Sequence, residues 1–493
     1  MAARYVGYEF LRESLGLTAF QQPPLARVGS VTRVSPFRED ILAIPAGVAP
    51  DGDDPLDHLL FALKHEAMNL QTAMLTLQRI PSGTLTAAFE ARPTGQYTRL
   101  AAFLWEQANQ AELPSAVAAA GPYVPVFDPA HYLTGTAQRN IRWRVDFNGL
   151  GSPRFCLTVR RTAGIEALLA RDILAQVQTF VASMDPDLLD RAVRWAYLSE
   201  TESSYDIERE TPTLDKREAF ARLLARAREQ EPLTEDALTA LQNLAVTNPF
   251  DRATGFRTSQ NWLRNNRRIT YLPPPPALGA ELMQEIMRWA NTPDPAVPPL
   301  VRAALVSFAF VFVHPFMDGN GRLSRFLFHQ VACQDPRLSN GLVLPVSIAM
   351  KRHERDYLAA LESFSKPARQ FWDATTVDTQ VFADFRGAPE IYRYWDATAC
   401  VEFSLRMAQE ALEKDLQDES AYLQRFDRAW RAVNDALDMN NDDLLLLVQS
   451  TLQNGGVLSN NRRKQFVAKG HPAEIIDRAA EIVAGLCAPD APP

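Results

Sequence analysis

The sequence predicts a mainly α-helical protein of several domains, with a mixed α/β region at its amino-terminal end. The chain has 493 residues, more than one compact core usually holds, so two or three domains are expected. Apolar residues recur at helical spacing through most of residues 166–366 and again after 370. The first third instead mixes helical patterns with segments in which apolar and polar residues alternate.

Residues 1–165 are expected to form an amino-terminal domain of unknown function. Residues 53–78 and 94–109 each have the apolar spacing of one amphipathic helix. Residues 141–147 and 154–161 both alternate and are separated by the turn-rich stretch Asn-Gly-Leu-Gly-Ser-Pro. This pattern predicts a β-hairpin. No catalytic motif occurs in this region, so a scaffold or partner-docking role is favoured.

Residues 166–366 are expected to form a helical central domain. A helix pattern over about 186–210 stops before Pro212, and two more helices follow, each opening with a threonine before an acidic residue. Residues of about 255–272 have β-rich ends around two asparagines and are followed by four prolines. They predict a short exposed hairpin and a stiff linker. Residues 296–313 are apolar almost throughout and predict a buried helix.

Residues 367–493 are expected to form a helical carboxy-terminal domain. Asn454-Gly455-Gly456 separates two helix patterns, which together resemble a helix-turn-helix. The second pattern is locally basic, but a helical docking module agrees better with the chain's net charge of -8 than DNA binding does.

Composition narrows the class of protein further. An acidic chain gives no support to non-specific nucleic-acid binding. The four cysteines, widely spaced and without a C-x-x-C pair, indicate free thiols in a reducing compartment. The first residues lack the layout of a signal peptide, and the longest apolar run, residues 303–313, is too short to span a bilayer. A cytoplasmic protein without a membrane segment is therefore expected.

Chemistry concentrates in the stretch HPFMDGNGRLSR, residues 314–325. Gly319, Asn320 and Gly321 place a glycine turn directly before a helix, where unpaired backbone N–H groups and the helix dipole favour an anion. Arg322 and Arg325 are three residues apart and so lie on one side of the first helical turn. Two guanidinium groups beside a nest of N–H groups suit a polyphosphate.

Two further residues complete this candidate site. Asp318 supplies a single carboxylate beside the phosphate cradle, which is the usual way in which Mg²⁺ is held together with phosphate and water oxygens. His314 ends the buried helix and can act as a general base near neutral pH. The assembly indicates phosphoryl or nucleotidyl transfer to a hydroxyl. It is not a Walker A loop, because G-x-x-x-x-G-K-[ST] is absent.

The same stretch resembles the Fic family signature H-P-F-x-[DE]-G-N-G-R-x-x-R at every fixed position. The resemblance implies transfer of AMP from ATP to a Ser, Thr or Tyr hydroxyl of a target protein. It implies that His314 is the base, Phe316 a core anchor and Asp318 the Mg²⁺ ligand. It also implies that Gly319, Asn320 and Gly321 form the anion hole, that Arg322 holds the outer phosphates and that Arg325 orients the γ-phosphate.

The resemblance extends to the surroundings of the motif. The hairpin would be the family's flap, which clamps the target segment by strand addition, with Thr258, Ser259, Gln260 and Asn261 as candidates for target contact. Trp262 beside them is equally a packing residue. Tyr357 would approach the nucleotide base.

A second motif lies upstream of the first. Many Fic proteins carry an inhibitory helix with the pattern [ST]-x-x-x-E-[GN], whose glutamate pairs with the second arginine of the signature. Ser204 and Glu208 have this spacing, but Arg209 stands where the family has Gly or Asn. The alternative is that Ser204 and Glu208 lie at a solvent-exposed helix end and have no inhibitory role. The inhibitory hypothesis predicts that Glu208 competes with the γ-phosphate for Arg325.

Two alternatives stay open from the sequence. The enzyme could use another nucleotide or remove AMP, with Glu208 positioning water. The chain could instead be a regulatory or DNA-associated adaptor whose Fic core is an accessory nucleotide sensor. The sequence also leaves open the target protein and the oligomeric state, a homo-oligomer included.

Overall fold

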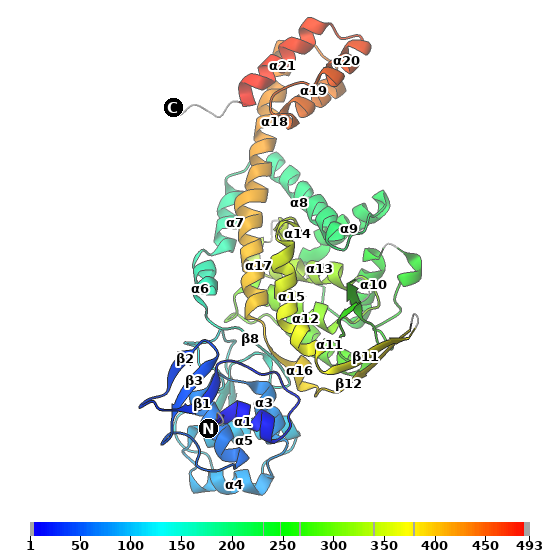
Figure 1. Ribbon diagram of the computed structural model, residues 1–493. Coiled ribbons are helices and arrows are strands. Elements are labelled where there is room, and N and C mark those ends of the chain that lie inside the picture. Colours follow the sequence, from blue (N-terminus) through cyan, green and yellow to red (C-terminus); the bar gives the residue numbers. More distant parts are fainter. Residues whose placement is uncertain are drawn as a thin grey trace.

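The structure is a computed structural model that describes residues 4–229, 231–246, 248–265, 268–338, 341–377 and 380–487. Helices dominate, as the sequence predicts. The amino-terminal unit lies at one end of an elongated molecule, the central helices follow, and a small helical unit lies at the other end (Figure 1).

The amino-terminal unit is mixed α/β, as expected. It contains the helices α1 (Gly7–Ser14), α2 (Pro55–His65), α3 (Leu70–Leu77), α4 (Ser82–Ala91) and α5 (Gln96–Asn109). It also contains a sheet of β1 (Leu25–Gly29), β3 (Ile41–Pro45) and β2 (Ser35–Arg38), in that order. Residues 53–78 form two helices rather than the single one expected. The chain breaks at Glu66, and the Asn69 side chain caps the second helix by accepting the Thr72 N–H at 3.0 Å.

The hairpin expected between residues 141–147 and 154–161 is wrong in its pairing. The strands here are β4 (Val124–Pro125), β5 (Gln138–Asn140), β6 (Val145–Phe147), β7 (Leu150–Ser152) and β8 (Phe155–Thr158). β6 pairs with β5 and β4, whereas β8 pairs with β7. The supposed turn is itself partly a strand, because Asn148 is held by two hydrogen bonds to the Phe127 backbone and the reversal comes later, at residues 153–154.

The central unit is built around two successive helices, α12 (Pro299–Val313) and α13 (Asn320–Ala332). α12 is buried along nearly its whole length because it is apolar on every side. The surrounding elements are α6 (Ala163–Ala170), α7 (Ile173–Ala182), α8 (Pro186–Ile207), α9 (Leu214–Arg226), η1 (Ala227–Glu229), α10 (Glu235–Ala245), η2 (Pro249–Asp251), β9 (Leu263–Asn265), β10 (Arg268–Tyr271), α11 (Pro276–Asn291), η3 (Pro336–Leu338), α14 (Val346–Arg352) and α15 (Glu354–Arg369). β9 and β10 form the expected antiparallel hairpin, whose tip lies outside the described residues.

The region after residue 367 begins with strands, where helices were expected. β11 (Trp372–Val377) and β12 (Gln380–Phe385) form a hairpin, and α16 (Glu390–Arg393) leads to β13 (Tyr394–Asp396), which pairs in parallel with β8. The stretch WDATTV has the β-branched, alternating character of a strand. Its alternating residues Trp372 and Ala374 pack, with Phe385, against the β9–β10 hairpin.

The remaining helices form the link to the carboxy-terminal unit and that unit itself (Figure 1). They are α17 (Thr398–Glu410), a π-helical segment η4 (Ala411–Leu416), α18 (Gln417–Ala436), α19 (Asn441–Gln453), α20 (Asn460–Ala468) and α21 (Ala473–Cys487). Val401 and Leu405 of α17 share one apolar core with α12, whereas Val433 of α18 packs with α19–α21 in a separate core. We propose that the carboxy-terminal unit begins within α18. Within the described part of the chain, no helix is both long and apolar enough to cross a bilayer.

Candidate active site

His314 ends α12 in the left-handed backbone region, with φ 52° and ψ 59°. Its Nδ1 lies 3.1 Å from the Val311 carbonyl oxygen. A carbonyl can only accept, so Nδ1 carries the proton and Nε2 keeps its lone pair. Burial lowers the pKa of His314 to about 4. The imidazole is therefore neutral at pH 7, the state that a general base requires.

Arg257 fixes the backbone around His314, and the sequence analysis missed it. Its Nε donates to the His314 carbonyl oxygen at 2.9 Å, and its backbone N–H donates to the Pro315 carbonyl oxygen at 2.7 Å. A further bond runs from its guanidinium to the Pro274 carbonyl oxygen. Burial lowers the pKa of Arg257 to about 10. The only sequence signal was an arginine shortly before a proline-rich linker, which does not indicate such a role.

The turn at residues 315–320, which follows His314 and is called the elbow, is held in shape by its own side chains. Phe316 is fully buried against Phe256 and Phe310. The Asn320 amide bonds both the N–H and the carbonyl of Phe316, at 3.0 and 2.8 Å. Gly319 has φ 83°, and a Cβ there would lie 3.1 Å from Val246. This position therefore requires glycine, and it starts α13 with its N–H groups facing the site.

Arg325 is bound by the end of α8. Its side chain is 2 % exposed. Its Nε donates to Ser204 Oγ at 2.7 Å, and its Nη2 donates to the Ser204 carbonyl oxygen at 2.9 Å and to Glu208 Oε1 at 2.8 Å. Although burial opposes it, the Glu208 carboxylate raises the pKa of Arg325. The two residues singled out upstream therefore both contact this arginine.

The Glu208 carboxylate also lies over Gly321. A methyl group at Gly321 would overlap Glu208 Oε1. Arg325 Nη1 faces the same glycine and is buried without a hydrogen-bond partner among the described residues. An orphaned guanidinium N–H beside a helix N-terminus is what an anion with several oxygens would satisfy.

Arg322 has a carboxylate of its own, which the sequence analysis did not identify. Its Nη1 donates to Glu210 Oε2 at 2.7 Å, and its Nη2 lies 3.3 Å from Asp318 Oδ2. The Tyr205 ring covers the guanidinium with a centroid distance of 5.1 Å. The side chain of Arg322 is 1 % exposed. The signal for Glu210 was present in the sequence as a second acid two residues after Glu208.

Arg209 occupies the left-handed region, with φ 58°. Gly and Asn are the residues that adopt this conformation most readily, which explains why the pattern stated above prefers them after the glutamate. Arg209 takes the same conformation at a cost of about 1 kcal/mol. The departure from the pattern therefore leaves the Glu208 geometry intact. The Arg209 side chain extends outward to Glu354 at 3.6 Å.

Asp318 is held through its backbone while its carboxylate stays partly exposed. The Gln242 amide donates to the Asp318 carbonyl oxygen at 3.2 Å and to the Asp251 carbonyl oxygen at 2.8 Å. The described residues contain no cluster of three or more metal-binding side chains. A lone carboxylate beside a phosphate cradle nevertheless fits Mg²⁺, which takes most of its ligands from phosphate and water.

The four flap candidates lie in the loop before β9 and differ in their contacts. Asn261 is buried and donates to the Phe316 carbonyl oxygen at 2.9 Å. Gln260 donates to the Pro273 carbonyl oxygen at 2.9 Å. Thr258 and Ser259 are exposed. The first two side chains therefore attach the flap to the elbow. Trp262 packs with the Trp372 cluster.

Tyr357 lies on α15, buried between the rings of Phe308 and Phe403. Burial raises its pKa, and nearby Arg325 partly offsets the rise. The structure thus brings Tyr357 to the arginine end of the site.

Comparison with known proteins finds a family that the region around this site resembles. Residues 232–332 match the model of the Fic/DOC family. This part of the chain is therefore similar to a Fic domain. It is 43% identical over 60 residues to the protein adenylyltransferase Fic of Drosophila sechellia, of Drosophila simulans and of Drosophila melanogaster. Each match covers 12% of this chain and 12% of the relative, so most of both proteins lies outside it.

Two solved structures are also similar to the Fic-domain chain. A Fic family protein from Desulfovibrio desulfuricans G20 aligns over 59% of this chain and 87% of its own, with 19% identity and a TM-score of 0.40. A Fic domain containing signaling protein from Bacteroides thetaiotaomicron VPI-5482 aligns over 51% and 97%, with 18% identity and a TM-score of 0.33.

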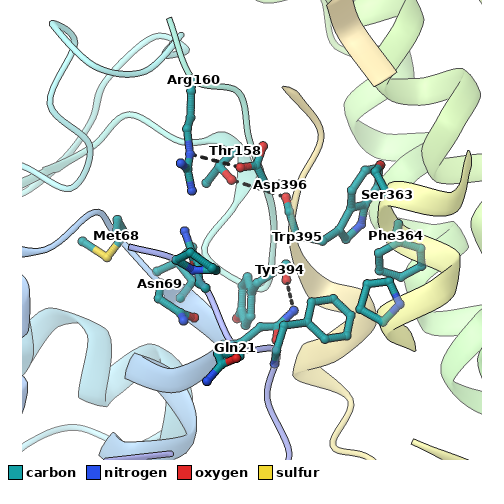
Figure 2. A pocket seen from close by; sticks show the side chains of 16 residues that line it. Gln21, Met68, Asn69, Thr158, Arg160, Ser363, Phe364, Tyr394, Trp395 and Asp396 are labelled. Carbon is teal, nitrogen blue, oxygen red and sulfur yellow. Dashed lines mark hydrogen bonds and ion pairs between the residues drawn. The ribbon is translucent and has the colours of Figure 1, made fainter. Parts of the chain in front are cut away.

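A separate pocket of about 250 Å³ lies between the amino-terminal unit and the Fic core (Figure 2). Its polar groups pair with one another. Arg160 lies 3.1 Å from Asp396, and the Gln71 amide donates to the Tyr394 carbonyl oxygen at 2.5 Å. These contacts join the two units through β13 and leave the pocket apart from the His314 site.

Proposed function

We propose that the protein is an adenylyltransferase that transfers AMP from ATP to a Ser, Thr or Tyr hydroxyl of a target protein. The observation that carries this proposal is a buried, neutral His314 with a free Nε2, set directly before a helix N-terminus and two buried arginines. The relatives named protein adenylyltransferase support the same reaction class.

In the proposed reaction, His314 Nε2 accepts the proton of the target hydroxyl, and the hydroxyl oxygen attacks the α-phosphorus of ATP. The new P–O bond forms as the bond to the bridging oxygen breaks, and its electron pair leaves with pyrophosphate. Arg322 and Arg325, with the backbone N–H groups of Gly319 and Gly321, hold the phosphates and offset their charge. Asp318 would hold Mg²⁺, which when bound neutralises phosphate charge.

We further propose that the state described is autoinhibited. Glu208 covers Gly321 and pairs with Arg325, so it occupies the place of a phosphate. Glu210 engages Arg322 in the same way. ATP must displace both carboxylates before its phosphates can reach the arginines.

The test is incubation with ATP labelled at the α-phosphate, comparing wild type, Glu208→Gly and Glu208→Gly/His314→Ala. We expect weak self-labelling in wild type and none in the double variant. Glu208→Gly should label at least tenfold more than wild type, because removing about 1.4 kcal/mol of competition has that effect. No label in any of the three, across ATP, GTP, CTP and UTP, would overturn the transferase proposal. Label without the increase would overturn the autoinhibition alone.

DNA binding is not part of the proposal. Several basic residues around α20 are paired with acids of the carboxy-terminal unit: Arg463 with Asp477 at 2.6 Å, and His471 with Asp443 at 2.7 Å. Lys469 also pairs with Asp443. These pairs neutralise part of the surface that would have to face phosphates.

A further inference from the structure

The flap segment has a charge opposite to that of the chain. Residues 252–280 contain five arginines and no Asp or Glu, whereas the chain has a net charge of -8. The arginines are Arg252, Arg257, Arg264, Arg267 and Arg268. A run of positively charged side chains beside a proposed active site indicates that the site recognises a negatively charged partner.

The structure separates one of these arginines from the others. Arg257 is buried and bonded to three backbone carbonyl groups, so it belongs to the support of His314. Arg267 lies outside the described residues. Arg252, Arg264 and Arg268 are exposed, and none of the three forms an ion pair with a carboxylate of the described residues.

The described acids of the adjacent β11–β12 hairpin are already paired. The β11–β12 hairpin packs against the flap through Trp372 and Ile269. Asp373 and Asp384, its two acids among the described residues, both pair with Arg386, which follows β12, at 3.1 and 2.8 Å. On the other side, Lys216 has a lowered pKa, caused by burial and then by the charge of Arg252. Among its described residues, the β11–β12 hairpin therefore offers the flap no unpaired carboxylate, and Lys216 adds a further cation on the other side.

The flap is also fixed relative to His314. The Arg257 N–H bonds the Pro315 carbonyl oxygen, and Asn261 bonds the Phe316 carbonyl oxygen. β9 follows directly, and among the described strands it pairs only with β10. Its second edge can therefore accept an extended segment, and Arg264 on β9 would flank that segment.

We propose that the flap selects targets whose modified hydroxyl lies in an acidic, extended segment, with Arg264, Arg268 and Arg252 as the residues that recognise its carboxylates. This inference rests on the proposed transferase function for the identity of the occupant. The expected preference for negative charge depends only on the exposed arginines of the flap.

Binding is measured first, without catalysis. Three fluorescent peptides of equal length carry one central threonine flanked by aspartates, by glycines and serines, or by lysines. Fluorescence anisotropy is recorded with Glu208→Gly protein at low salt and at 0.5 M NaCl. We expect the acidic peptide to bind about tenfold more tightly than the lysine peptide, since several exposed pairs each contribute modestly. The difference should shrink at high salt.

The charge-reversed variant Arg264→Glu/Arg268→Glu, in the same background, should invert the order of the peptides. The neutral variant Arg264→Gln/Arg268→Gln should abolish the preference. The matched control is Arg462→Glu/Arg478→Glu, which makes the same charge change on α20 and α21 and should keep the order. Equal binding of the three peptides, or an unchanged order in the reversed variant, would overturn the inference.

Transfer of labelled AMP to the same peptides separates this inference from the function. Label on the acidic peptide above the others supports both. Label on all three peptides equally overturns the recognition and leaves the transferase function standing. Charge-selective binding that inverts in the reversed variant, with no label on any peptide or on the protein, overturns the transferase function and supports the recognition.

Discussion

At the scale of single residues, the site is defined by two buried arginines that each have a carboxylate partner from the end of α8. Glu208 pairs with Arg325 and Glu210 with Arg322. Their positions differ by two residues, and the left-handed Arg209 between them redirects the chain so that both side chains reach the motif helix. A single acid would leave one arginine without a carboxylate partner from this segment.

Glu210→Gln should therefore raise self-labelling about three- to tenfold over wild type, because one of two competing contacts is lost. Combined with Glu208→Gly, it should raise labelling above that of either single variant. Incorporation of label from ATP measures both. Glu202→Gln, an exposed change on the same helix that removes a pair with Arg217, is the control. Labelling by Glu210→Gln no different from that by Glu202→Gln would contradict the role of Glu210.

His314 makes a prediction about pH. Its pKa in the folded protein is about 4, below the 6.5 of a free histidine. The base stays neutral down to that value, so single-turnover labelling by Glu208→Gly should stay level from pH 8 to 6 on account of this group. The labelling rate should fall on the acidic side only near pH 4 to 5. A fall in the labelling rate centred at pH 6.5 would show that the imidazole titrates as if it were exposed.

At the scale of elements, α8 is anchored by a buried contact far from the end that carries Glu208. Glu200 lies 2.9 Å from His329 of α13 and accepts two hydrogen bonds from Ser347 of α14. Burial raises the pKa of Glu200, but the ion pair and these bonds outweigh it, and the pKa is lowered. Its stabilisation is therefore present above its usual pKa and lost as the pH falls.

Glu200→Gln should loosen α8 without touching Glu208 or Glu210. We expect a loss of about 2 kcal/mol of unfolding free energy and increased self-labelling by the otherwise wild-type chain. Chemical denaturation and label incorporation are the two measurements. In a Glu208→Gly background the same change should add little labelling. A stability loss with unchanged wild-type labelling would show that α8 does not need this anchor to inhibit.

At the scale of the whole molecule, the units are joined by contacts between residues that belong to no recognised sequence motif. β13 pairs with β8, α17 lies in the core of α12, and α18 leads out to the last unit. The amino-terminal unit has a half-buried titratable group of its own. Glu66 accepts the Tyr8 N–H at 3.0 Å, and burial raises its pKa to about 8.

This group predicts how stability depends on pH. The folded state holds a proton on Glu66 that the unfolded state releases near pH 4.5. Stability from this group is therefore full below about pH 4.5 and is lost as the pH rises towards 8. Glu66→Gln should weaken this loss, as seen in thermal unfolding at pH 5, 7 and 8.5. The exposed Glu474→Gln is the control, and parallel pH curves for wild type and Glu66→Gln would contradict the assignment.

The sequence by itself determined the helical class and the β9–β10 hairpin, and it supplied the residues that we propose form the phosphate cradle. These features are local: the Gly319 turn, the three-residue step between the arginines and the four-residue step from Ser204 to Glu208 depend on chain neighbours and helical period. Only the tertiary structure decided that Glu210 reaches Arg322 and that Arg257 holds His314. It likewise decided that β8 pairs with β13 instead of β6. These contacts join residues far apart in the chain, and packing of whole elements, not local pattern, selects them.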